Sequence, residues 1–314
     1  RRIGGLDPPQ HRIQTMNSQL AMKAHQPMNS PESLTLTTRD GYALQALRYT
    51  TTGPLRGHLV VAGATGVPQL FYKNFALFAA QQGYTTLTVD YRGIGLSKPA
   101  ELRGFEMDYL DWAFHDVAAA VDAMADDTVP LFMVGHSFGG HAFGLLPNHD
   151  KVARFYTFAT GAGWHGWMPR AEQFKVLLMW HVIGPLLTRW KGYLAWSKLQ
   201  MGEDLPMGVY RDWKRWCKFP RYFFDDPGMP HVAGLFGRVR TPIIAANATD
   251  DLWAPPASRD AFMAGYSNTT VRKVDIHPGQ LGIGPIGHMG YFRRQAQPLW
   301  DDVLTWFGEH QAAH

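Results

Sequence analysis

Short apolar runs alternate with segments of helical spacing along most of this chain, and this alternation limits the folds that it can adopt. Residues 58–62 (HLVVA) form a near-continuous apolar run, as expected of a strand buried on both faces of a mostly parallel sheet. Residues 71–82 follow with apolar side chains at helical spacing, and Gly83 ends the expected helix. Repetition of this unit predicts an α/β fold with right-handed crossovers.

The same patterns locate the other expected elements. Two strands, 34–37 and 43–49, flank Asp40-Gly41, a pair typical of hairpin turns, so we expect them to be antiparallel. Further strands are expected at residues 85–89, 131–134, 155–158, 241–245 and 270–276, and further helices at 105–124, 138–146, 258–265 and 295–307. The prediction is a mostly parallel sheet of eight strands that is flanked by helices.

The alternation is interrupted between Gly161 and Thr241. Residues 164–240 are helical and aromatic in pattern, so we expect a helical cap inserted into a core made of residues 33–163 and 241–314. Residues 1–32 show neither a hydrophobic period nor the basic and apolar regions of a signal peptide. We expect them to form a flexible N-terminal extension.

The composition excludes several classes of protein. Hydrophobic residues make up 46% of the chain and charged residues 18%, which is the balance of a globular protein with a substantial core. The net charge of +4 over 314 residues gives no support for a nucleic-acid partner. Cys217 is the single cysteine, so neither an internal disulfide nor a cysteine-based zinc site is expected, and we expect no metal and no cofactor. The apolar runs are too short for a transmembrane segment, and the expected location is cytoplasmic.

The most specific motif is residues 135–140 (GHSFGG), between an expected strand and an expected helix. It matches G-x-S-x-G, in which a sharp strand-to-helix turn exposes the serine hydroxyl and the glycines permit a close backbone approach. Ser137 is therefore the candidate nucleophile, and His136 is expected to pack beside it. The alternative is an ordinary glycine-rich loop between a strand and a helix.

A serine hydroxyl is inert without a base, and the base needs a carboxylate to orient it. Asp251 follows an apolar strand, and we favour it over Asp250 because the spacing D-x-x-x-P matches the acid loop of many hydrolases. In the alternative, either carboxylate caps the next helix. His288 lies in a glycine-rich loop before the last helix, and we favour it over His277 as the base.

These residues resemble the α/β-hydrolase superfamily over residues 33–307. Residues 89–97 (VDYRGIGLS) are similar to the D-x-R-G-x-G-x-S loop that follows the fourth strand of such proteins. The combination of DYRGIG, GHSFGG and GHMGYF resembles poorly characterised bacterial serine hydrolases near the serine-aminopeptidase and monoglyceride-lipase branch. The resemblance implies the α/β-hydrolase fold with a helical cap over the nucleophile. A serine at position 137 excludes the haloalkane dehalogenases, which carry aspartate there.

Two backbone N–H groups are expected to form an oxyanion hole. The first belongs to Phe138, at the start of a helix, where the helix dipole favours negative charge. The resemblance implies that the second comes from the turn after the third strand, where related proteins commonly carry His-Gly and this chain has residues 62–67 (AGATGV). Ala64, Thr65 and Gly66 are all candidates, and we favour Thr65.

Seven of the eleven tryptophans lie in residues 164–224. If this insertion covers the nucleophile, an apolar acyl pocket is expected there, lined by Trp164, Trp167, Trp180, Trp213 and Met179. The alternative for each ring is packing of the cap against the sheet. The same segment holds ten Lys and Arg residues but only four Asp and Glu residues. A solvated helix face is the favoured cause, and an anionic substrate or weak association with an anionic lipid surface is the alternative.

These features together predict a cofactor-free serine hydrolase that cleaves a carboxylic ester, or a related acyl bond, of a hydrophobic small molecule through an acyl-enzyme. An acyltransferase that uses the same three residues is one alternative, since a dry aromatic cap excludes water from the acyl-enzyme. A non-catalytic, small-molecule-binding member of the fold is another.

Overall fold

Eight strands form one sheet in the computed structural model, which describes residues 30–312. The strands are β1 (Glu32–Thr37), β2 (Ala43–Tyr49), β3 (Gly57–Ala62), β4 (Tyr84–Val89), β5 (Leu131–His136), β6 (Val152–Phe158), β7 (Ile243–Ala248) and β8 (Val271–Ile276). Their order across the sheet is β1-β2-β4-β3-β5-β6-β7-β8. All neighbours from β4 to β8 pair in parallel, whereas β2 pairs antiparallel with β1 and with β4. The prediction of a mostly parallel eight-stranded sheet, opened by an antiparallel hairpin, is confirmed.

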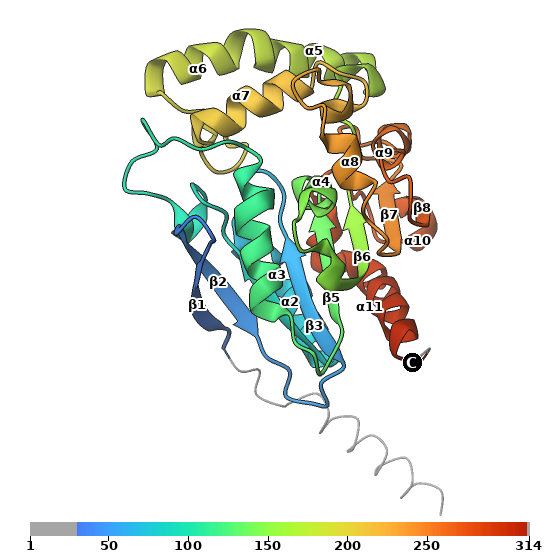
Figure 1. The fold of residues 1–314 in the computed structure, drawn as a ribbon. Coiled ribbons are helices and arrows are strands. Elements are labelled where there is room, and N and C mark those ends of the chain that lie inside the picture. Colours follow the sequence, from blue (N-terminus) through green and yellow to red (C-terminus); the bar gives the residue numbers. More distant parts are fainter. Residues whose placement is uncertain (1–29, 313–314) are drawn as a thin grey trace, which may run out of the picture. The chain divides into compact units, whose positions relative to one another are not determined.

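Helices cover both faces of this sheet (Figure 1). They are α2 (Lys73–Gln81), α3 (Ala118–Met124), α4 (Phe138–Ala142), α8 (Val232–Phe236), α9 (Pro256–Met263), α10 (Pro278–Leu281) and α11 (Gln297–Ala312). Successive residues of a strand point to opposite faces, so β3 supplies both cores. Leu59 and Val61 pack in one cluster with residues of α2 and α11. Val60 and Ala62 pack in the other cluster with residues of α3, α4 and α9.

The helix expected at residues 105–124 begins late. Only Trp112–Val117, in a π-helical segment, and the following α3 are helical. Tyr109 donates its backbone N–H to the Asp212 carboxylate at 3.0 Å, and Asp108 donates its own to Asp111 at 2.9 Å. These side chains take N–H groups that a longer helix would use, so the prediction was wrong over residues 105–110. The helix expected at 138–146 likewise ends as an α-helix at Ala142.

Three further helices lie beyond the carboxyl ends of the strands (Figure 1). Helix α5 (Arg170–Leu178) runs through a π-helical segment (Met179–Ile183) into α6 (Gly184–Lys191) without leaving the right-handed helical region, and α7 (Met207–Trp216) lies beneath it. These helices belong to the same compact unit as the sheet. In the part of the chain that the structure describes, no helix is both long and apolar enough to cross a membrane. Of the extension expected at residues 1–32, residues 1–29 lie outside the described part and Glu32 begins β1.

The segment after β4 ties two loops of this edge together. The Asp90 carboxylate accepts the backbone N–H of Gln69 at 2.7 Å and that of Leu96 at 3.0 Å. Ser97 donates its hydroxyl to the Asp90 carbonyl oxygen at 2.6 Å. Gly95 has a φ of +52°, and a Cβ there would lie 2.4 Å from the Asp90 carboxylate. The motif D-x-R-G-x-G-x-S therefore fixes the segment that leaves β3, beside which the candidate nucleophile lies.

Candidate active site

Ser137 occupies a sharp turn between β5 and α4. Its φ of +52° lies in the left-handed region, which is unusual for a residue with a side chain. The neighbouring glycines leave no room for a Cβ, since one on Gly139 would lie 2.0 Å from the Ala62 carbonyl oxygen and one on Gly140 would lie 1.8 Å from the Thr160 hydroxyl. The turn thus presents the Ser137 hydroxyl at the carboxyl edge of the sheet, as the motif predicted.

A line of hydrogen bonds joins Ser137 to two loops that are distant in sequence. The Ser137 hydroxyl lies 3.1 Å from His288 Nε2, and His288 Nδ1 lies 3.0 and 3.1 Å from the two Asp251 carboxylate oxygens. Asp251 follows β7, and His288 follows α10. With Nδ1 protonated toward Asp251, Nε2 accepts the serine proton, which is the arrangement needed to activate an alcohol.

Asp251 is fully buried but well supplied with donors. Its carboxylate accepts backbone N–H groups from Trp253 at 3.0 Å and Ala254 at 2.9 Å, and the Tyr291 hydroxyl at 3.2 Å. Burial raises the pKa of this carboxyl, but the charge and hydrogen bond of His288 and the two N–H groups outweigh it, so the pKa lies below its usual value. Asp251 is therefore ionised at neutral pH and holds the His288 ring in one orientation.

Asp250 and His277, the alternatives to Asp251 and His288, do not join this line of hydrogen bonds. Asp250 accepts the backbone N–H groups of Ile286 at 2.9 Å and Gly287 at 3.1 Å, so it fixes the loop that carries His288. His277 is exposed and precedes α10, where its backbone carbonyl accepts the N–H of Gln280 at 3.0 Å. The structure brings Ser137 together with Asp251 and His288.

A second hydrogen-bonded chain passes behind the nucleophile. Ala64 donates its N–H to the Tyr72 hydroxyl at 2.7 Å, and that hydroxyl lies 2.9 Å from His136 Nδ1. His136 Nε2 lies 2.9 Å from the backbone carbonyl oxygen of His288. Burial lowers the pKa of His136 to about 3, so its ring is neutral, accepts from Tyr72 and donates to His288. Sequence patterns indicated only that His136 packs there, because Tyr72 meets it through the fold.

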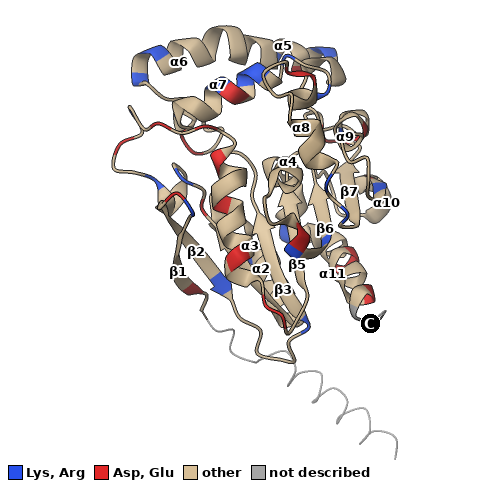
Figure 2. Ribbon diagram, in the orientation of Figure 1, with Lys and Arg blue, Asp and Glu red and all other residues tan. Residues whose placement is uncertain are grey.

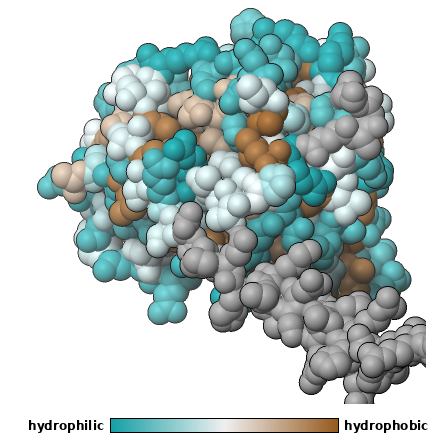
Figure 3. Space-filling view, turned by 90° about the horizontal axis from the view of Figure 1, so that it is seen from below, coloured by the Kyte–Doolittle hydropathy of each residue, from teal (hydrophilic) through white to brown (hydrophobic). Residues whose placement is uncertain are grey.

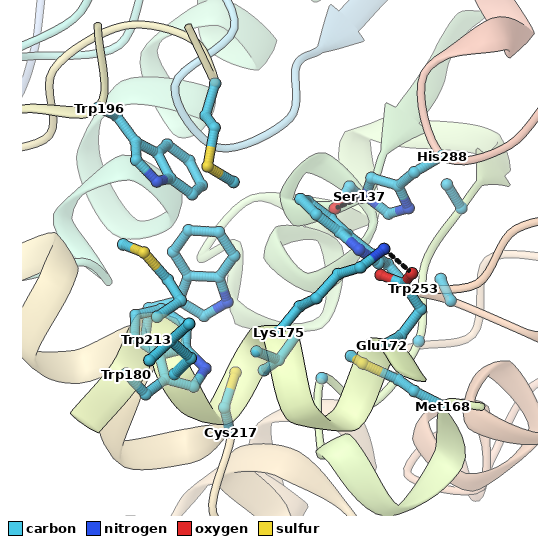
Figure 4. Close-up of a pocket in the computed structure, with 18 of the residues that line it drawn as sticks. Ser137, Met168, Glu172, Lys175, Trp180, Trp196, Trp213, Cys217, Trp253 and His288 are labelled. Atoms are coloured by element: carbon cyan, nitrogen blue, oxygen red, sulfur yellow. Dashed lines mark hydrogen bonds and ion pairs between the residues drawn. The ribbon is translucent and has the colours of Figure 1, made fainter. Parts of the chain in front are cut away.

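A cavity of about 470 Å³ opens beside Ser137. Figure 4 shows Ser137 and His288 at one end and three tryptophans at the other. Trp213 packs edge-on against Trp180 and against Trp196, with ring centroids 5.2 Å apart in both pairs. The lining also includes the ion pair of Lys175 with Glu172 at 2.6 Å, in addition to Met168, Val176, Leu178, Met179, Ile183, Leu199, Met201 and Trp253. The cavity is apolar apart from a few placed polar groups, which is typical of small-molecule sites.

Two of the indole rings lining this cavity carry unused donors. The side-chain Nε1 groups of Trp180 and Trp196 are buried, and neither has a hydrogen-bond acceptor among the described residues. His141 also lines the cavity; its Nε2 lies 2.8 Å from the Gly161 carbonyl oxygen, and its Nδ1 has no partner in the same part of the chain. Buried polar atoms are normally paired.

Residues 59–293 match the model of the alpha/beta hydrolase family. The chain belongs to the alpha/beta hydrolase family. A search of curated protein sequences finds no match.

Solved structures agree with the hydrolase fold at low sequence identity. A soluble variant of monoglyceride lipase from Saccharomyces cerevisiae, in complex with a substrate analogue, is 16% identical, with a TM-score of 0.64 over 90% of this chain and 97% of that one. An esterase from Pyrococcus furiosus is 13% identical, with a TM-score of 0.58 over 99% and 96%. The thioesterase domain of the curacin biosynthetic pathway is 14% identical, with a TM-score of 0.55 over 88% and 100%.

The two turns that carry the expected oxyanion donors are neighbours in the structure. The turn after β3 lies beside the Ser137 turn, because Ala62 pairs with Gly135. The backbone N–H groups of Phe138 and Thr65 have no acceptor among the described residues. Ala64 was a wrong candidate, since its N–H already donates to Tyr72. Thr65 stays the prediction for the second donor, and its hydroxyl is hydrogen-bonded to the Tyr109 hydroxyl.

Two of the predicted pocket residues lie elsewhere in this alpha/beta hydrolase. Trp180, Trp213 and Met179 line the cavity, but Trp164 and Trp167 do not. Trp167 donates its indole N–H to the Pro220 carbonyl oxygen at 2.8 Å. The rings of Trp164 and Trp167 pack edge-on against each other.

Trp196, another of the seven tryptophans in residues 164–224, also lines the cavity. The sequence prediction missed one wall residue, Trp253, although its position two residues after Asp251 is a sequence signal. In the described part of the chain, no three His, Cys, Asp or Glu side chains group as metal ligands would.

Proposed function

We propose that this chain is a serine hydrolase that cleaves carboxylic esters, or related acyl bonds, of hydrophobic small molecules. The observation that carries the proposal is the hydrogen-bonded line from Ser137 through His288 to Asp251, whose Ser137 end faces an apolar cavity. Family membership supports the same reaction class.

In the proposed reaction, His288 Nε2 takes the proton of the Ser137 hydroxyl as the oxygen attacks the substrate carbonyl carbon. The developing oxyanion accepts the N–H groups of Phe138 and Thr65. His288 then gives its proton to the leaving alkoxide, which departs as the alcohol and leaves an acyl-enzyme ester on Ser137. Water attacks that ester in the second half, again with His288 as the base, and the carboxylic acid is released.

The cavity indicates the class of substrate. Its wall is built from tryptophan, methionine and aliphatic side chains, and about 470 Å³ suits the acyl or alcohol part of a small molecule. The monoglyceride lipase and the esterase that share this fold fit an ester substrate. We therefore expect esters of intermediate chain length to react faster than acetate esters.

Activity toward nitrophenyl esters of increasing acyl length tests the proposal. Each buried methylene contributes about 0.8 kcal/mol, so kcat/KM rises up to about fourfold per methylene until the cavity is filled. Ser137→Ala abolishes turnover and covalent labelling by a fluorophosphonate, whereas Ser267→Ala, at an exposed serine, retains both. Labelling that persists in Ser137→Ala contradicts the assignment of the nucleophile.

A further inference from the structure

The continuous helix formed by α5 and α6 carries a stripe of exposed apolar side chains. Five large residues occur at intervals of four along it and are 38–69% exposed: Phe174, Leu178, Val182, Leu186 and Trp190. Only seven other large hydrophobic residues are comparably exposed in the described part of the chain, and two of those, Leu199 and Met201, follow this helix. We call the face that carries these five residues the outer face.

The helix that carries the outer face is packed against the rest of the protein on its other side. The opposite side of the helix is buried at Met179, Trp180, Gly184 and Thr188. There the Trp180 ring packs against the rings of Tyr210 and Trp213 of α7. A helix that is apolar on both sides but covered on one has a second surface to bury. Viewed from below, on the side away from this helix, hydrophobic residues form small groups among hydrophilic ones (Figure 3).

Positive charge accompanies the stripe. The helix carries four cations, Arg170, Lys175, Arg189 and Lys191, which lie at both ends of α5–α6 (Figure 2). Glu172 is its single anion; its side chain is only 13% exposed and is paired with Lys175. The Lys191 ammonium also lies 4.1 Å from the Trp190 ring centroid, at the end of the stripe. The outward charge of this helix is therefore positive.

The same helix forms a wall of the cavity. Leu178, a residue of the outer face, lines the cavity, and so do Lys175, Val176, Met179 and Ile183, so the outer face borders the cavity. A molecule that leaves an apolar phase in contact with the outer face is therefore next to the wall of the cavity that holds Ser137.

We propose that the outer face of α5–α6 docks on the surface of an anionic lipid membrane, with the helix lying in the plane of the interface. Twenty-two residues give a helix of about 33 Å, whose apolar stripe enters the headgroup boundary while the flanking cations bind lipid phosphates. A second copy of the chain fits less well. Two-fold pairing along this helix would set the cations of one end against those of the other. The proposal is independent of the reaction at Ser137.

Co-sedimentation with vesicles tests the proposal. The full chain is expected to bind vesicles of phosphatidylcholine containing about 30% phosphatidylglycerol, and to bind phosphatidylcholine alone at least about tenfold more weakly. The variant Phe174→Ser/Leu186→Ser/Trp190→Ser loses at least about tenfold in vesicle affinity. The variant Arg170→Gln/Arg189→Gln/Lys191→Gln loses the preference for phosphatidylglycerol, as does the wild type in about 0.5 M NaCl.

Matched controls separate docking from changes in folding. Leu55→Ser/Leu281→Ser removes two exposed leucines elsewhere, and Lys73→Gln/Arg272→Gln removes two exposed cations elsewhere; both variants bind like wild type. None of the substituted residues lines the cavity, so all variants keep the same thermal unfolding midpoint and the same rate on a water-soluble ester, if that activity is present. Equal vesicle binding by the serine variant, or a wild-type dimer that this variant converts to monomer without any vesicle binding, overturns the proposal.

Discussion

His136 donates a hydrogen bond from Nε2 to the backbone carbonyl oxygen of His288, at 2.9 Å. The residue before the candidate nucleophile thereby holds the backbone of the candidate base. The other ring nitrogen of His136 accepts the Tyr72 hydroxyl, which in turn accepts the Ala64 N–H. One chain of side chains thus connects the turn after β3, the Ser137 turn and the His288 loop.

Tyr72→Phe breaks this chain without changing the ring that packs there. We expect kcat to fall about tenfold with little change in KM, because the His288 backbone and the turn after β3 lose a shared support. The Ala64 N–H is left unpaired, so the free energy of unfolding falls by about 1–3 kcal/mol. Steady-state kinetics measures kcat and KM, and urea unfolding measures the free energy of unfolding. Tyr84→Phe, which removes a buried hydroxyl at the start of β4, is the control and should leave kcat unchanged. A purely structural role for Tyr72 would lower stability but not kcat.

The adjacent carboxylates Asp250 and Asp251 differ in their expected effect on turnover. Asp251→Asn removes the charge that orients His288, and in a Ser-His-Asp triad such a change lowers kcat by about 10⁴. Asp250→Asn weakens only the acceptor for the Ile286 and Gly287 N–H groups, so we expect a fall of about tenfold. Single-turnover acylation rates compare the two variants. A larger loss in Asp250→Asn would reverse the proposed roles.

Acid destabilises the fold through its buried histidines. Burial lowers the pKa of His141 to about 4, whereas an unfolded histidine has a pKa of about 6.5. Between these values the unfolded chain binds the proton and the native state does not, so the free energy of unfolding falls as the pH falls from about 6.5 to 4. The contribution of His141 is complete above pH 6.5. We expect the slope of stability with pH to be smaller in His141→Gln by up to about 1.4 kcal/mol per pH unit. Urea unfolding between about pH 4 and pH 6.5 measures this slope. Equal slopes in wild type and His141→Gln would contradict the lowered pKa of His141.

Trp213 and Trp164, both in residues 164–224, should differ in their effect on the preference for acyl-chain length. Trp213→Ala removes the ring between Trp180 and Trp196, so kcat/KM for a decanoate ester falls about tenfold more than that for an acetate ester. Trp164→Ala is the matched control, because Trp164 does not line the cavity. The ratio of the two kcat/KM values is the measurement. An equal change of this ratio in both variants would place the acyl chain elsewhere.

The central strands could be predicted because a strand buried on both faces leaves a near-continuous apolar run, as at 58–62 and 131–134. The positions of Ser137, Asp251 and His288 could be predicted for a related reason. Ser137 directly follows β5, Asp251 follows β7, and His288 lies in the loop beyond β8 and α10. These parallel strands end at one edge of the sheet, where functional loops gather. The local sequence was therefore sufficient to predict both the strands and the loops that hold the candidate catalytic residues.

Contacts between distant segments could not be predicted in this way. The non-helical start at residues 105–110 depends on Asp212, which lies about a hundred positions further along. Tyr72 looks like an ordinary helix residue until the fold brings its hydroxyl to His136. Trp164 and Trp213 both belong to the tryptophan-rich residues 164–224, and the sequence does not distinguish them. Only the packing of the folded chain decides that Trp213 lines the cavity and Trp164 does not.

The indole N–H groups of Trp180 and Trp196 are buried, and neither has an acceptor among the described residues. Each therefore already carries the cost of an unpaired donor, which a plain alkyl chain in the cavity leaves unchanged. If the proposed reaction takes place here, we expect an acyl chain with a hydroxyl, ether or keto oxygen beside either ring to gain a hydrogen bond that an alkyl chain of the same length does not gain.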